Sequence, residues 1–188
     1  MTEPFDDANG KRLLAIAREA VRAAAAGERL RVAVADEPAE LRLPGAAFVT
    51  LRSADGSLRG CIGSLSPVRP LAEDVAANAA SAALRDPRFT PVTPTEVPTL
   101  AVSIAVLSPF EPIEAADEGA LLAQLRPGVD GLVIRDRGRR AVFLPQVWGQ
   151  LPEPRAFLDA LKQKAGLGLE PLSQALEAER FTVSSIGK

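Results

Sequence analysis

Apolar residues recur along the chain with two spacings, and each spacing predicts one type of element. Spacing of three or four positions predicts helices, which we expect over residues 11–26, 70–85, 118–125 and 155–165. Alternation, or a short apolar run bounded by turn residues, predicts strands, which we expect over residues 47–51, 58–65, 100–107, 131–134, 141–144 and 180–184. We also expect a strand over 30–35 and a short helix over 171–178.

Glycine and proline residues mark the starts and ends of the predicted helices. Gly27 and Gly166 follow two of the predicted helices, where a left-handed residue ends a helix. Pro70 and Pro154 stand at helix starts, where a missing N–H costs nothing. The pair Asp86-Pro87 ends the second helix, because the residue before proline is pushed out of the α region.

Strands joined by hairpins, with helices inserted between them, predict an α+β fold. We expect a mainly antiparallel sheet flanked by helices, with a smaller second lobe. Residues 100–107 alternate large side chains with alanine and serine. We expect the small face of this strand to lie against the alanine-rich helix that contains residues 76–83. The whole chain, residues 1–188, is interpreted as one domain, either undivided or with two lobes.

The clearest hairpin signal brackets an unusual hexapeptide. Asp55-Gly56 separates two apolar runs, a pattern typical of a tight turn whose centre tolerates positive φ. The second run begins Leu58-Arg59-Gly60-Cys61-Ile62-Gly63 and contains the single cysteine of the chain. Glycine inside a strand marks a bulge or a close backbone approach. The two flanking glycines therefore predict a surface at which bulk is not tolerated.

Composition places the chain among globular proteins of the reducing cytoplasm. Apolar residues make up 47% and charged residues 24% of 188 residues, and a chain of this size buries about 70% of its unfolded surface. No apolar run approaches the ~18 residues that span a membrane, so no membrane association is expected. Residues 1–10 are acidic and lack the apolar stretch of a secretory signal. A single free cysteine also fits a cytoplasmic protein.

The net charge of −2 does not indicate nucleic-acid binding. One basic cluster falls on the tip of a predicted hairpin, and it consists of Arg135, Arg137, Arg139 and Arg140. Asp130 and Asp136 lie close to it in sequence, so a solvated turn is favoured over a phosphate-binding patch.

Several residue types are missing or rare in this chain, and this limits the catalytic and metal-binding sites that it can form. The chain has no histidine and no tyrosine. A Ser-His-Asp or Cys-His pair cannot be built, and histidine-ligated metal sites are excluded. One cysteine also rules out an intramolecular disulfide, a two-thiol redox motif and the three-cysteine cluster of a radical enzyme. We therefore expect no metal and no cofactor.

Cys61 is the candidate nucleophile, with two readings. A free cysteine is most often an inert core thiol. Arg59 lies two residues earlier, so a regular strand would place both side chains on one face, where the cation would favour the thiolate. A bulge at Gly60 would separate them. Gly60 and Gly63 are candidate ligand-binding positions, because their backbone is open to close approach.

Arg88 and Asn78 complete the candidate ligand-binding set. Arg88 either pairs with Asp86 and the end of the helix or converges with Arg59 on one anionic group, which two guanidinium forks would suit. Asn78 falls in mid-helix, where propensity does not favour asparagine. With its neighbours Glu73 and Asp74, it is expected to supply polar groups to a site, unless it is exposed and unpartnered.

The hexapeptide at 58–63 resembles the signature of the AMMECR domain family, whose bacterial and archaeal members are called AmmeMemoRadiSam system protein A. Three later motifs are also similar to the family, at residues 86–89, 143–147 and 157–167. The resemblance runs from about Leu13 to about Phe181. The chain departs from the family at Leu161-Lys162-Gln163, near which members often carry a second cysteine.

The resemblance implies an AMMECR-like fold, no established biochemical activity, and association with Memo-type and radical S-adenosylmethionine proteins. Three functional readings remain. The first is an accessory or ligand-binding protein that works with those partners and binds a small anionic ligand. The alternative is an enzyme in which Cys61, assisted by Arg59, attacks a small molecule or a modified nucleotide. The third is a structural role, in which the hexapeptide serves only packing.

Overall fold

A computed structural model describes residues 7–168, 170–173 and 176–187. Contacts within the chain divide it into two compact units, Met1–Leu107 with Ser184–Lys188, and Ser108–Val183. Each unit has its own antiparallel sheet and its own apolar core. The predicted α+β class with mainly antiparallel sheets is therefore confirmed.

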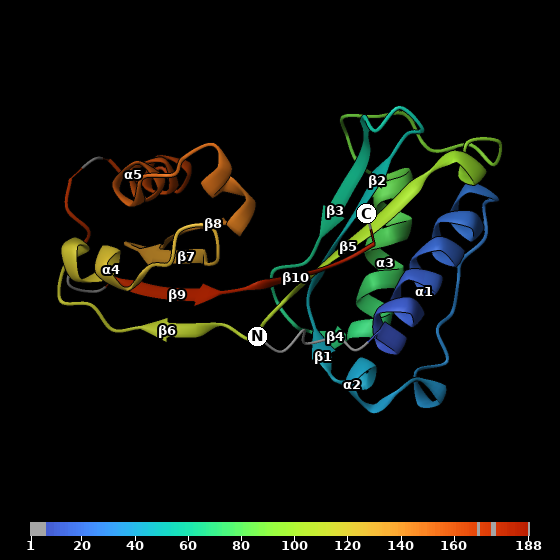
Figure 1. The fold of residues 1–188 in the computed structure, drawn as a ribbon, viewed down its shortest axis with the longest axis horizontal. Helices are drawn as coiled ribbons and strands as arrows, with labels where there is room; N and C mark the ends of the chain where they lie inside the picture. Colours follow the sequence, from blue (N-terminus) through green and yellow to red (C-terminus); the bar gives the residue numbers. More distant parts are fainter. Residues whose placement is uncertain (1–6, 169, 174–175, 188) are drawn as a thin grey trace. The chain divides into compact units, whose positions relative to one another are not determined.

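The first unit is a four-stranded sheet covered on one face by two helices (Figure 1). Its strand order is β10-β5-β2-β3, so β3 is an edge strand. The strands are β2 (Ala47–Arg52), β3 (Leu58–Gly63), β5 (Ala101–Leu107) and β10 (Val183–Ile186). The helices are α1 (Asp7–Ala25) and α3 (Leu71–Leu84). Short elements complete the unit: η1 (Val34–Asp36), α2 (Ala39–Arg42), the two-stranded ribbon β1 (Pro44–Gly45) with β4 (Arg69–Pro70), and η2 (Val97–Thr99).

Alternation on β2 decides which face of this sheet is covered. Ala47, Val49 and Leu51 are fully buried, whereas the residues between them are partly exposed. The buried residues share one core with α1 and α3. Because successive side chains on a strand point to opposite faces, Phe48 and Thr50 lie on the face away from the helices.

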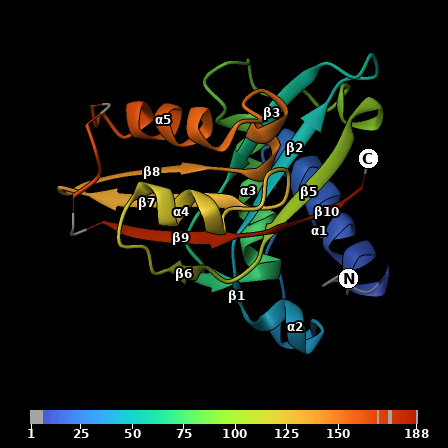
Figure 2. The same cartoon turned by 60° about the vertical axis from the view of Figure 1, so that its left-hand side comes forward.

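The second unit packs a four-stranded sheet with two α-helices and one 3-10 helix (Figure 2). The strand order is β6-β9-β7-β8, and all its pairs are antiparallel. Its strands are β6 (Glu111–Ile113), β7 (Gly131–Asp136), β8 (Arg139–Phe143) and β9 (Glu177–Phe181), and its helices are α4 (Glu118–Gln124), η3 (Pro145–Gly149) and α5 (Pro154–Lys164). Trp148 stacks on Phe157 with ring centroids 3.8 Å apart, at the centre of this core.

Several predicted boundaries are confirmed by local geometry. Gly27 and Gly166 adopt positive φ after α1 and α5. Asp86-Pro87 follows the end of α3. The hairpin of β2 and β3 forms as predicted, but among the described residues of its loop only Gly56 has positive φ. The loop closes through hydrogen bonds between Ser53 and Ser57 and between Gly56 and Ser53, so it is longer than a two-residue turn.

Two predicted elements are wrong for physical reasons. Residues 30–35 form no strand, because Leu30 and Val32 pack against the core instead of pairing with a neighbouring strand, and η1 follows. The helix over 171–178 is absent at 171–173, and Glu177 and Ala178 belong to β9; residues 174–175 lie outside the described residues. Pairing of Ala178 with both β6 and β7 overrides local helix propensity there.

The orientation of β5 also differs from expectation. Its large residues Val102, Ile104 and Val106 are buried in the core shared with the helices. The small residues between them face the other side and are more exposed. Small helix residues and large strand residues are complementary, which is the reverse of the small-on-small contact that we predicted. Among the described residues, no helix has the length and apolar character needed to cross a bilayer.

Candidate functional site

Cys61 lies on the edge strand β3 and faces away from the helices. Its cross-strand partner is Thr50, on the face of β2 that points away from the helices. The Thr50 hydroxyl donates a hydrogen bond to Cys61 Sγ at 3.2 Å. The thiol residue is half-buried, not sealed in the core. The prediction of an inert core thiol therefore does not describe this position.

Asp86 secures the outer edge of β3 beside the thiol. The backbone N–H of Cys61 donates to Asp86 Oδ2 at 2.8 Å. An edge strand presents unpaired N–H groups that invite pairing with other chains, and this carboxylate satisfies one of them. Asp86 is itself only 4% exposed. Hydrogen bonds from Arg88, together with the backbone N–H of Cys61, hold the pKa of Asp86 well below its usual range despite its burial.

Arg88 brings a cation to the same place. Its Nε and Nη2 donate to Asp86 Oδ1 and Oδ2 at 2.9 and 2.7 Å, a bidentate pair. The side chain is 54% exposed. Among the described residues, its Nη1 has no hydrogen-bond partner. The pKa of Arg88 is raised, first by the hydrogen bonds to Asp86 and further by the nearby Cys61. The simpler expectation, pairing with Asp86, is thus confirmed.

Arg59 is held elsewhere. The β2–β3 register shifts so that Leu51 faces Gly60 and Arg52 faces Leu58, which leaves Arg59 as a bulge without a partner. Arg59 Nε donates to Glu96 at 2.9 Å, and Nη1 donates to the carbonyl oxygen of Thr90 at 2.9 Å. The hydrogen bonds that Glu96 accepts from Arg59, and then from the backbone and side chain of Thr93, lower the pKa of Glu96 to about 2. The two arginines are therefore anchored by different carboxylates, and the thiol accepts its hydrogen bond from Thr50.

The two glycines of the hexapeptide fit against protein atoms. A Cβ on Gly60 would lie 2.2 Å from the carbonyl oxygen of Ala82 in α3. A Cβ on Gly63 would lie 2.2 Å from Cγ of Phe48. The sequence-based prediction that neither glycine position tolerates a larger side chain is therefore confirmed. The cause is close packing of β3 against helix α3 and against a neighbouring ring.

Asn78 belongs to a buried polar network that ties α3 to the sheet. Its Nδ2 lies 2.9 Å from the carbonyl oxygen of Ala47 and 2.9 Å from Asp74 Oδ2. Asp74 is fully buried and accepts from the N–H of Ala47, the Ser64 hydroxyl and Arg69 Nε. Among the described residues, neither side chain forms a hydrogen bond with Cys61, whose partners are Thr50 and Asp86. Glu73, next to them, is exposed.

The arginines of the β7–β8 hairpin are mostly engaged within the second unit. Arg135 pairs with Glu179 at 2.6 Å, Arg137 lies 3.7 Å from Asp136, and Arg139 donates to the carbonyl oxygen of Gly166. These pairs agree with a solvated, charge-balanced hairpin.

Two contributors to the site escaped sequence reasoning. Thr50 carries no motif of its own and becomes a partner only through the hairpin register. Asp86 was interpreted as a helix terminator, and its contact with Cys61 spans 25 positions. The register could have been read from the alternation on each side of Asp55-Gly56, but the long-range contact has no local signal.

Acid should weaken the fold through Asp86 and Glu96. Both carboxylates have folded pKa values below the ~4 of an unfolded chain. Their stabilisation is complete above the unfolded pKa and is lost as the pH falls through the folded pKa, because the unfolded chain binds protons first. We expect the free energy of unfolding to fall from about pH 4 down to about pH 2. Urea titrations across this range should show a shallower fall for Asp86→Asn; an unchanged slope would contradict the assignment.

Comparison with known proteins agrees with this two-unit α+β architecture. The AMMECR1 family profile matches residues 14–186, and the chain belongs to this family. It is 38% identical to a protein of Methanothermobacter thermautotrophicus over 167 residues, covering 87% of this chain and 85% of that one. It is 40% identical to a protein of Aeropyrum pernix, covering 95% and 78%. The crystal structure of an uncharacterised protein from Pyrococcus horikoshii is similar, with a TM-score of 0.77 and 32% identity over 93% of this chain and 88% of that one.

Proposed function

We propose that this chain is an accessory, ligand-binding protein whose binding site is the thiol cluster formed by Thr50, Cys61, Asp86 and Arg88. The observation that supports it is the bidentate Arg88–Asp86 pair beside a half-buried thiol. Asp86 orients Arg88 and simultaneously fixes the backbone of Cys61. The guanidinium keeps Nη1 for a ligand, and guanidinium groups suit carboxylate and phosphate. The ligand class is a small anion.

The other predicted positions act in this proposal by placing the strand. Gly60 lets β3 approach α3, and Gly63 makes room for Phe48. Asn78 holds the beginning of β2, the strand that carries Thr50. Arg59 anchors β3 to Glu96 at the other side of the hexapeptide. These residues would hold Cys61 in position without touching the ligand.

A second candidate is an enzyme with Cys61 as nucleophile acting on a small molecule or a modified nucleotide. The hydrogen bond from Thr50 to Sγ favours it, since this bond fixes the position of the sulfur on the strand. Arg59, the assisting residue expected from the sequence, is occupied by Glu96, so Arg88 would take that part. The nearest carboxylate, Asp86, is a poor proton acceptor because its pKa is held well below the usual range. Binding is therefore the better-supported function.

Alkylation of the single cysteine tests the site directly. Iodoacetate is an anion and iodoacetamide is neutral, so the ratio of their rates reports the local charge and cancels the thiolate fraction. We expect Arg88→Gln to lower the iodoacetate-to-iodoacetamide ratio about threefold, as removal of one nearby charge in a partly screened site would. Rates are measured by mass spectrometry on the whole chain.

The matched control is Arg22→Gln, which removes the same charge from an exposed position on α1. It should leave the iodoacetate-to-iodoacetamide ratio unchanged. An unchanged ratio in Arg88→Gln would refute the site, and a fall in Arg59→Gln alone would restore the original assignment to Arg59. The resemblance supports cytoplasmic association with Memo-type and radical S-adenosylmethionine proteins. A partner of this kind that covers the thiol cluster should slow both reagents equally.

A further inference from the structure

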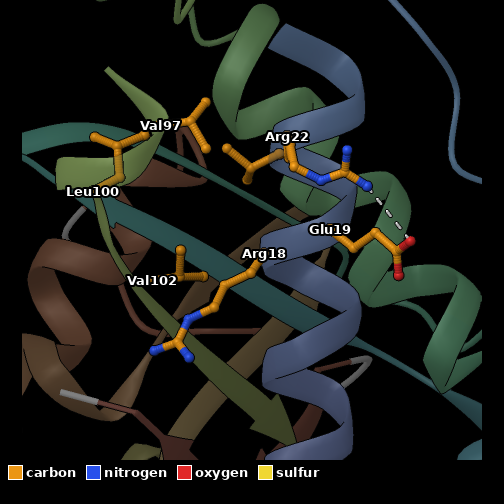
Figure 3. Close-up of a pocket in the computed structure, with 7 residues that line it drawn as sticks. Arg18, Glu19, Arg22, Val97, Leu100 and Val102 are labelled. Carbon is orange, nitrogen blue, oxygen red and sulfur yellow. Dashed lines mark ion pairs between the residues drawn. The ribbon is translucent and has the colours of Figure 1, made fainter. Parts of the chain in front are cut away.

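A cavity lies in the first unit, between helix α1 and strand β5. The cavity has a volume of about 370 Å³ and is lined by Arg18, Glu19, Val21, Arg22, Val97, Leu100 and Val102. Its size falls in the range of small-molecule sites, about 300–1,000 Å³. Figure 3 shows its labelled side chains converging from α1 on one side and from η2 and β5 on the other.

The inner part of the cavity is apolar. Val21 and Val102 are buried members of the core, and Val97 and Leu100 are partly buried against it. Val97 lies in the surface turn η2 and Leu100 directly follows it. This arrangement leaves four branched side chains facing one hollow, which gives a ligand an apolar floor. Burial of apolar ligand surface there would supply most of the binding free energy.

The rim carries an excess of positive charge. Two arginines and one glutamate line the cavity, so the formal charge is 2 − 1 = +1. Arg22 lies 3.7 Å from Glu19, and both are well exposed at 66% and 49%. Figure 3 shows the Arg22 guanidinium turned toward Glu19, whereas Arg18 extends on the side of Val102. Among the described residues, Arg18 has no hydrogen-bond or ion-pair partner.

From this juxtaposition we propose that the cavity binds a small organic carboxylate with an apolar tail, with the tail on the valine and leucine floor and the carboxylate on Arg18. The apolar floor selects a hydrocarbon portion, and the free guanidinium at its edge selects an anion. The site is independent of the thiol cluster. Val102 faces the helix-covered side of the sheet, and Cys61 faces the other side.

A neighbouring cavity shows why the charge pattern matters. It has a volume of about 230 Å³ and lies between α1 and residues 30–37. Arg12 there is bound by Glu37 through two hydrogen bonds of 2.8 and 2.6 Å, so its charge is already matched. That cavity is lined by a second arginine, Arg31, but also by Glu19, Asp36 and Glu37, so its acidic residues outnumber its arginines and would repel an anion. The excess of positive charge on the lining therefore distinguishes the first cavity.

Titration of the whole chain with octanoate, followed by methyl NMR, tests the proposal. We expect chemical-shift changes centred on the methyl groups of Val97, Leu100 and Val102. Arg18→Gln should weaken octanoate binding about fivefold, the effect of one exposed charge pair of ~1 kcal/mol. Val97→Phe places a ring in the hollow from a half-buried surface turn and should abolish the shifts.

Octylamine and octanol are the matched ligands, and Arg52→Gln, on the hairpin, is the matched protein control. Octanoate should bind more tightly than either analogue, and Arg52→Gln should bind octanoate like the unmodified chain. Equal binding of octylamine would overturn the anion part of the proposal. Shifts at other methyl groups, no shifts at all, or unchanged affinity in both Arg18→Gln and Val97→Phe would overturn the site itself.

Discussion

Gly60→Ala is expected to destabilise the first unit by about 3 kcal/mol or more, the size of a severe packing defect. The new methyl group would lie 2.2 Å from the backbone carbonyl oxygen of Ala82, which cannot move without displacing helix α3. Strand β3 would have to separate from that helix. Urea denaturation followed by circular dichroism measures the loss. Tryptophan fluorescence would report on the other unit, because Trp148, the single tryptophan, lies there. The rate at which Cys61 is labelled in the native state therefore serves as the second measurement on the first unit.

Two glycine substitutions serve as controls for this prediction. Gly149→Ala should be nearly neutral, because nothing lies within 4 Å of a Cβ at that position. Gly63→Ala should be destabilising, but Phe48→Ala in the same chain should restore part of the loss, since the obstacle there is a side chain. A Gly60→Ala chain as stable as Gly149→Ala would show that β3 and α3 are not held at this distance.

Asp74→Ala is expected to cost about 3–5 kcal/mol, as the loss of one partner from a buried charged network does. Asp74 is 0% exposed, and its two oxygens accept from the N–H of Ala47, from Ser64, from Arg69 and from Asn78. Removing the carboxylate leaves the N–H of Ala47 and the hydroxyl of Ser64 without their acceptor, which loosens the start of β2. The midpoint and slope of urea denaturation give the change in free energy.

Glu73→Ala is the matched control for Asp74, because it removes the same charge from the same helical turn at an exposed position. It should cost no more than about 1 kcal/mol, the value of an acidic residue near a helix start. Asp74→Asn should fall between the two, since the amide keeps one acceptor and adds a donor where donors already converge. Similar losses in Asp74→Ala and Glu73→Ala would refute the network's role.

The predicted elements succeeded where the local pattern and the tertiary contacts agree. Helices α1, α3 and α5 have apolar stripes that face a core, and Gly27 and Gly166 end two of them. The prediction for the first residues of strand β9 was wrong, because these residues have a helix-like pattern. Their pairing with β6 and β7 decides their conformation instead. Non-local pairing leaves little trace in a window of a few residues.

The candidate site was predicted in part. The sequence singled out Cys61, Arg88 and the intolerant glycines, and the structure brings the first two together through Asp86. It separates Arg59, because a bulge and a salt bridge to Glu96 redirect that side chain. Asn78 turned out to hold α3 to β2. A motif can mark residues as unusual, but it does not say which atoms they contact.

The sequence by itself determined the helices α1, α3, α4 and α5, the hairpin, the single thiol and the absence of histidine chemistry, because these depend on local spacing or on residue counts alone. Only the tertiary structure decided which arginine stands by Cys61, which face of the sheet carries the thiol, and where Arg18 meets an apolar hollow. Each of these depends on strand register and on contacts across 25 or more positions, as between Cys61 and Asp86. Such contacts form when whole elements pack, so no local pattern of residues encodes them.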